Sequence, residues 1–123
     1  MSLPAFRQLE PHEKGWGRED WVCNTSDYCG KILRFHAGKR FSAHFHAVKA
    51  ETFMLLSGTV SFCWNDPQTA AKEYRTLVAG DVVDIPRFCV HQIEALTDAV
   101  VIEFSTHHED SDSYRVRPGD SQK

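Results

Sequence analysis

The chain has 123 residues, 41% of them apolar and 25% charged, with a formal net charge of −3, which fits one globular domain and excludes a disordered chain. A mildly acidic chain without a basic patch is not expected to bind nucleic acid, and no uncharged apolar run is long enough to cross a membrane. The N-terminus lacks the pattern of a secretory signal, so we expect a cytoplasmic protein with no membrane partner.

Short segments rich in Val, Ile, Phe, Trp and Thr alternate with turns that contain Gly, Pro, Asn or Asp. This pattern predicts β-strands, and no segment shows the 3.6-residue period of a long amphipathic helix. The sequence therefore indicates an all-β sandwich or barrel. The predicted strands span residues 20–23, 28–36, 40–46, 51–56, 59–64, 73–78, 82–85, 90–96 and 99–105.

The two ends of the chain differ from the middle, although all three parts are expected to form one domain. Residues 1–19 contain two prolines and mixed charge, and we expect them to form an arm that wraps the surface of a barrel made by residues 20–105. Residues 106–123 are polar and acidic, and their composition favours a solvated, partly mobile tail. Composition leaves open whether this tail closes over a site.

Four residues form a candidate metal site. His44 and His46 are separated by one residue, so on a strand both imidazoles would lie on one face. A short turn then delivers Glu51 beside them, and a later segment with a proline corner supplies His91. Imidazole nitrogens with one carboxylate oxygen suit a divalent transition metal ion, which could be Zn, Mn, Fe, Co or Ni.

The same residues resemble the two motifs of the cupin superfamily, G-x5-HxH-x3,4-E-x6-G and G-x5-PxG-x2-H-x3-N. Phe88 replaces the inner glycine of the second motif and Ala95 replaces its asparagine, while the histidine spacing survives. The resemblance implies a double-stranded β-helix (jelly-roll, cupin) barrel with the metal inside. The matching residues are Gly38, His44, His46, Glu51 and Gly58 in the first motif, and Gly80, Pro86 and His91 in the second.

Strand alternation places further polar residues near this site. Ser42 and Arg40 share the face of His44, so Arg40 could bind a phosphate or carboxylate, or instead lie in a surface salt bridge. The same alternation puts Lys31 on an inner face, where it would need an acidic partner or an anionic ligand. Lys49 could face the metal, although a turn lysine in water is the favoured alternative.

Glu103 lies in an apolar strand, Val-Val-Ile-Glu-Phe. If it faces inward, burial would raise its pKa towards that of a general base. A glutamate facing solvent is an equally good interpretation of the sequence.

Three histidines and one carboxylate leave open positions on the ion, which is typical of catalytic sites. A Lys-Gly-Trp-Gly segment at residues 14–17, Ser42, residues 82–86 and an Asp-Ser-Asp-Ser-Tyr-Arg tail ending at Arg115 resemble the cupin part of type II mannose-6-phosphate isomerases. The H-x-H-x-x-K-x-E arrangement is also similar to that of metal-dependent D-lyxose isomerases. These resemblances imply an aldose–ketose isomerase, or an epimerase, of a sugar or sugar phosphate.

In that interpretation Lys31, Lys49 or Glu103 would move the proton, and Arg40 or Arg115 would hold a phosphate. An Fe(II)-dependent dioxygenase and a non-catalytic sugar-binding or sensing module are the alternatives, because the fold alone does not determine activity. The resemblance also implies a homodimer.

Overall fold

The computed structural model describes residues 2–123, which form strands and two short 3₁₀ helices, η1 and η2. Neither helix is long enough or apolar enough to span a bilayer, and the described residues contain no other helix. The elements are β1 (Glu10–Lys14), β2 (Gly17–Asn24), β3 (Cys29–Phe35), β4 (Ala43–Phe45), β5 (Glu51–Ser57), β6 (Thr59–Asn65), β7 (Lys72–Val78), β8 (Val82–Ile85), β9 (His91–Ala95), β10 (Ala99–Ser105), η1 (Asp110–Asp112), β11 (Tyr114–Arg117) and η2 (Asp120–Gln122).

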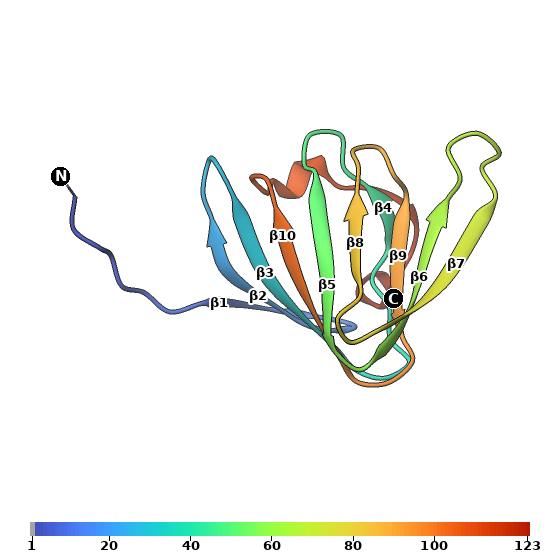
Figure 1. Ribbon diagram of the computed structural model, residues 1–123, viewed down its shortest axis with the longest axis horizontal. Helices are drawn as coiled ribbons and strands as arrows, with labels where there is room; N and C mark the ends of the chain where they lie inside the picture. Colours follow the sequence, from blue (N-terminus) through green and yellow to red (C-terminus); the bar gives the residue numbers. More distant parts are fainter. Residues whose placement is uncertain (1) are drawn as a thin grey trace.

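The strands form two antiparallel sheets, ordered β1-β2-β3-β10-β5-β8 and β11-β4-β9-β6-β7. Strands distant in sequence are neighbours in each sheet, as β3, β10 and β5 show. The two sheets converge at one end of the molecule and open at the other (Figure 1). This arrangement confirms the predicted jelly-roll barrel.

The inner faces of the two sheets separate an apolar end from a polar end. Alternating strand residues point inward, and they are apolar in the C-terminal parts of β3 and β5 and in the N-terminal part of the antiparallel β10. At the other end the register places Glu103 opposite Lys31, and Ser105 opposite Glu51. The barrel therefore carries its ionisable residues in one half, above a core that includes Leu33, Phe35, Phe53, Leu55, Val60, Ile93, Ala95, Ala99 and Val101.

Two strands, β1 and β11, lie outside the range 20–105 that was predicted for the barrel. β1 is an edge strand that pairs only with β2, and β11 pairs with β4. Both strands are mostly exposed, so neither shows the apolar alternation from which strands are predicted. The segment predicted as a strand at 40–46 is regular only over β4, with one isolated bridge between Arg40 and Glu94.

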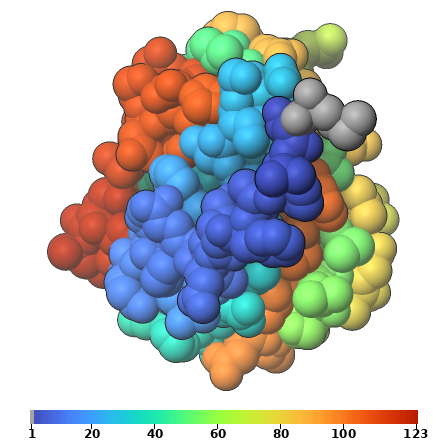
Figure 2. Space-filling view, turned by 90° about the vertical axis from the view of Figure 1, so that its left-hand side faces the viewer, coloured from blue at the N-terminus to red at the C-terminus, as the bar shows by residue number. Residues whose placement is uncertain are grey.

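The N-terminal arm does not wrap the barrel as predicted. Residues 2–9 lead away from the two sheets (Figure 1), apart from a hydrogen bond that the Arg7 guanidinium donates to the carbonyl of Val22 on β2. The side chains of Leu3 and Phe6 are exposed. On the face from which the arm projects, the C-terminal residues lie beside the β1–β2 hairpin (Figure 2). The backbone N–H of Gly15 donates to Ser121 Oγ there, over 3.0 Å.

Candidate metal centre

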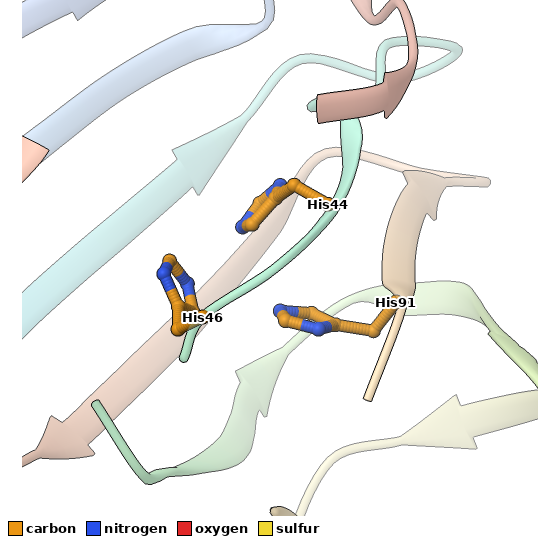
Figure 3. A group of neighbouring side chains, drawn as sticks. All are labelled: His44, His46 and His91. Atoms are coloured by element: carbon orange, nitrogen blue, oxygen red, sulfur yellow. The ribbon is translucent and has the colours of Figure 1, made fainter. Parts of the chain in front are cut away.

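Three histidines converge inside the polar half of the barrel. His44 lies in β4, His46 follows that strand immediately, and His91 opens β9 directly opposite His44 in the register. Their rings point toward one another (Figure 3), and one nitrogen from each lies within 4.8 Å of the others. Glu51, the first residue of β5, places Oε1 at 2.9 Å from His91 Nε2 and at 3.4 Å from His46 Nε2.

Backbone carbonyls fix the orientation of each ring. Nδ1 of His44, His46 and His91 lies 2.7, 2.7 and 2.9 Å from the carbonyl oxygens of Ser42, Asp112 and Cys89, respectively. A carbonyl oxygen only accepts, so Nδ1 carries the proton and Nε2 presents its lone pair to the centre. Metal-binding histidines commonly show this arrangement.

The protonation states also suit a cation. Burial and the neighbouring His91 and His46 lower the pKa of His44 to about 3, so this ring is neutral at physiological pH. Burial works to raise the pKa of Glu51, but the neighbouring His46, His91 and Lys49 side chains hold it well below its ordinary value. The carboxylate is therefore charged, as a ligand to a cation must be.

Two buried atoms at the centre lack a bonding partner. Glu51 Oε1 and His91 Nε2 have no hydrogen bond of good geometry to any residue in the range 2–123, although they face each other. Buried polar atoms without partners are rare, because each costs free energy. A divalent ion would satisfy both, so the four residues fit the metal site predicted from the sequence.

Lys49 is buried beside the centre, so the favoured expectation of a turn lysine in water is wrong. Its Nζ lies 3.1 Å from Glu103 Oε2, 3.1 Å from His108 Nδ1 and 3.4 Å from Glu51 Oε2. Burial works to lower the pKa of Lys49, but Glu103 and Glu51 more than offset this and raise it. Glu103 therefore also faces inward and accepts from a lysine that remains charged.

His108 extends this network to the surface, and sequence reasoning missed it. Burial, together with the charges of Lys31 and Lys49, lowers the pKa of His108 to about 4, so the ring is neutral. Lys49 donates to its Nδ1, and Nε2 therefore carries the proton and donates to Asp110 Oδ1 over 2.9 Å. Lys49, which is ion-paired with Glu51 at the metal centre, is thus linked through the His108 ring to an exposed carboxylate.

Lys31 faces inward, as strand alternation predicted, and has the acidic partner that this position requires. Its side chain is 2% exposed, and Nζ lies 3.0 Å from Glu19 Oε1. The ammonium also lies 4.6 Å from the centroid of the Trp21 ring, whose Nε1 donates to the same glutamate oxygen over 2.7 Å. Burial works to raise the pKa of Glu19, but Lys31 and Trp21 lower it overall.

Asp112 ties the C-terminal segment to the metal-binding turn. Its buried carboxylate accepts hydrogen bonds from the backbone N–H groups of Ala47, Val48 and Lys49, with distances of 2.8 to 3.2 Å. Its own carbonyl orients His46, as described above. The segment from residue 106 is therefore packed against the site, contrary to the solvated tail that its composition suggested.

The remaining predicted residues occupy different positions. Ser42 is buried, and its Oγ lies 3.1 Å from His44 Nδ1. Arg40 lies outside the cavity, with Nη1 3.8 Å from a Glu94 oxygen, which is the salt-bridged alternative allowed by the sequence. Arg115 lies opposite His44 on β11 and lines the cavity with an exposed side chain.

Phe88, the main departure from the second motif, adopts a left-handed backbone with φ of 68°. Glycine favours this conformation and other residues rarely adopt it. The N–H of Phe88 donates to the carbonyl of His46 over 2.8 Å, so the turn before β9 still contacts the metal-binding segment. The substitution has therefore not displaced His91 from the centre.

His44, His46 and Glu51 line a cavity of about 390 Å³, which is within the usual size range for ligand pockets. It is bounded by β2, β3, β5 and β10 on one side, and by β4 and the C-terminal residues on the other. Its polar lining comprises Lys14, Glu19, Lys31, Ser42, His44, His46, Lys49, Glu51, Glu103, His108, Asp110, Ser113, Arg115, Ser121 and Gln122.

Comparison with known proteins shows which solved structures share this fold. No family model matches the chain, and no curated protein matches it. Among solved structures it is similar to the capsular polysaccharide assembling protein CapF of Staphylococcus aureus, with 22% identity and a TM-score of 0.80 over 91% of this chain and 32% of that one. It is also similar to the oxalate decarboxylase of Bacillus subtilis, with 15% identity and a TM-score of 0.76 over 88% of this chain and 30% of that one.

The chain therefore shares the jelly-roll fold of these proteins, and its three-histidine centre is a candidate metal site. The chain spans about a third of the length of these solved chains. The B. subtilis oxalate decarboxylase contains Mn(II) centres.

Proposed function

We propose that this chain is a metal-dependent aldose–ketose isomerase of a sugar or sugar phosphate, similar to mannose-6-phosphate isomerases. The proposal is supported mainly by the buried three-histidine and Glu51 centre, which adjoins a hydrogen-bonded acid–base network in one cavity. A divalent ion bound there would polarise the carbonyl and hydroxyl oxygens of a sugar.

The network narrows the choice of the proton-transferring group. Isomerisation requires one group that removes a proton from carbon and returns it to the neighbouring carbon. Lys49 is held in its charged form by two carboxylates, and the Lys31 ammonium is paired with Glu19. We therefore assign the base to Glu103, with Lys49 orienting its carboxylate.

The proposal also includes a binding residue for the phosphate of the substrate and a second copy of the chain. Arg115 stands at the cavity wall with an exposed guanidinium, where it could bind a phosphate on the far end of the sugar. A homodimer remains our expectation, and the exposed apolar arm of residues 2–9 is a surface available for pairing.

The test is isomerisation in D₂O by protein reconstituted with each candidate metal. Solvent deuterium appearing on carbon during interconversion of an aldose phosphate and its ketose would report the proton transfer directly. The E103Q variant should bind metal normally and lose about 100-fold or more in kcat. E73Q is the matched control, because Glu73 is exposed on β7 and should leave kcat unchanged.

The other outcomes select the alternatives. Dioxygen consumption by the Fe(II)-loaded protein, without isomerisation, would replace the proposal with a dioxygenase. Sugar binding with no turnover under any metal would indicate a binding or sensing module.

A further inference from the structure

The charged residues around the cavity would balance one another once a divalent ion is bound. The two buried lysines carry two positive charges, and the three buried carboxylates carry four negative charges together with the partly buried Glu19. A divalent ion, held by neutral imidazoles, would neutralise the remaining two negative charges. An uncompensated buried charge is costly, so the loaded interior favours a ligand group without charge. The residues counted are Lys31, Lys49, Glu19, Glu51, Glu103 and Asp112.

Lys31 keeps an unused hydrogen-bond donor on the cavity wall. Its ammonium has three N–H groups, of which one donates to Glu19 Oε1 over 3.0 Å. The ammonium also lies 4.6 Å from the centroid of the Trp21 ring, whose face takes the place of a second acceptor. Among residues 2–123 Nζ has no further acceptor, so at least one N–H is open to a ligand in the cavity.

Glu19 keeps an unused acceptor beside that donor. Its Oε1 accepts from Lys31 and also from Trp21 Nε1, over 2.7 Å. Its Oε2 accepts from no residue that the structure describes, although Glu19 lines the cavity. The carboxylate is charged because it is paired with Lys31, so Oε2 would repel a carboxylate or phosphate and accept a hydrogen bond from a hydroxyl.

The position of Lys31 suits a ligand that also reaches the metal centre. Lys31 on β3 and Glu51 on β5 line the same cavity, and only β10 lies between their strands. Neighbouring strands are about 4.8 Å apart, so about 10 Å separates β3 from β5. Glu103, which we assign as the base, projects from β10 between them. A sugar chain could therefore contact the metal, the base and Lys31 at once.

We propose that Lys31 and Glu19 form a hydroxyl-binding subsite, which holds free hydroxyl groups of a sugar whose carbonyl end lies at the metal centre. A hydroxyl both accepts and donates, so it matches an open N–H beside an open carboxylate oxygen. Trp21 holds both side chains in place before a ligand arrives, which lowers the cost of binding. This inference rests on the proposed function and specifies its substrate: a sugar that is uncharged at this subsite, with any phosphate bound elsewhere, as at Arg115.

The experiment compares two neutral ligands with equal numbers of carbon atoms. Hexane-1,2-diol and D-mannitol both offer a vicinal diol to the metal, but only D-mannitol also offers hydroxyl groups to Lys31 and Glu19. In calorimetric titration of the zinc-loaded protein, we expect D-mannitol to bind about 10-fold more tightly or better, because hydrogen bonds to charged groups are strong.

The variants K31M and E19Q should each weaken D-mannitol binding about 10-fold or more. Both should keep their affinities for zinc and for hexane-1,2-diol within about twofold, because neither residue contacts the metal ligands. K14M is the matched control, because Lys14 lines the same cavity but is exposed and screened by water, and it should bind D-mannitol as the wild type does.

Equal binding of D-mannitol and hexane-1,2-diol by the wild type would overturn the inference, and this comparison stands even if a variant fails to fold. A folded K31M or E19Q that retains wild-type affinity for D-mannitol would overturn the role of that residue. Since turnover is not measured, a D-mannitol preference that K31M loses, without any isomerase activity, would support the subsite while refuting the proposed function. Isomerisation of a sugar by a protein that binds both ligands equally would do the reverse.

Discussion

Removing the Asp112 carboxylate should weaken both the fold and the metal site. The carboxylate accepts hydrogen bonds from three consecutive N–H groups at the start of the turn that carries Lys49 and leads to Glu51. Hydrogen bonds to a charged group contribute about 1.5–3 kcal/mol each, but bonds that share one carboxylate are not additive. We therefore expect D112A to lose roughly 2–4 kcal/mol of unfolding free energy.

The same substitution should lower metal affinity about 10- to 100-fold, the range seen when groups that orient a ligand are removed. Urea unfolding would measure the first effect, and competition with a calibrated chelator would measure the second. D66A is the matched control, because Asp66 accepts from the N–H groups of Gln68 and Thr69 in the β6–β7 turn, away from the centre. It should lose stability without changing metal affinity.

Unchanged metal affinity in a folded D112A would refute this reasoning. Truncation after Ser105 gives a second test, because it removes Asp112 together with β11. Removal of a solvated tail, as its composition suggested, would leave the barrel folded and metal-loaded. The structure leads us to expect weaker metal binding and lower stability instead.

Three further predictions concern His91, the ion pairs of Asp20 with Arg18 and Arg34, and the exposed residues 2–9. H91A should abolish stoichiometric metal binding, measured by elemental analysis of the dialysed protein, and metal retention would refute the ligand assignment. Burial works to raise the pKa of Asp20, but Arg34 and Arg18 lower it overall, below its ordinary value of 3.8. The charged Asp20 therefore stabilises the folded state above pH 3.8, and this contribution is lost as the pH falls through the lower pKa of the folded protein. The urea midpoint should therefore stay level from pH 7 to about 5 and fall below about pH 4, with D20N showing a weaker acid dependence. If residues 2–9 mediate pairing, light scattering should give twice 14.0 kDa for the full chain and a monomer for a chain starting at residue 10.

His44, His46 and Glu51 could be predicted from local geometry, whereas His91 was predicted from the match of its segment to the second cupin motif. One intervening residue places His44 and His46 on one side of the chain, and a short turn brings Glu51 beside them, while His91 arrives through the pairing of β9 with β4. The inward direction of Lys31 followed from the same alternation. Most strand positions were also predictable, because their apolar residues recur with period two.

The groups that orient these ligands could not be predicted, because they arrive from distant parts of the chain. Asp112 and His108 lie in a polar stretch whose composition is that of a solvated tail. Lys49 lies in a turn, where alternation does not apply, and its burial depends on the Asp112 carboxylate that holds the turn. Trp21 and Glu19 carry no signal until β2 is paired with β3.

The polar half of the barrel links metal binding to folding. Closing the barrel buries three carboxylates and two lysines, and leaves Glu51 Oε1 and His91 Nε2 without hydrogen-bond partners among residues 2–123. A bound cation would stabilise the folded state by offsetting the net negative charge and coordinating both atoms. The C-terminal segment then contributes to the same equilibrium, because Asp112 holds the turn that connects two of the four ligands, His46 and Glu51. Metal affinity and the docking of this segment should therefore change together, which is why a substitution at Asp112 probes both.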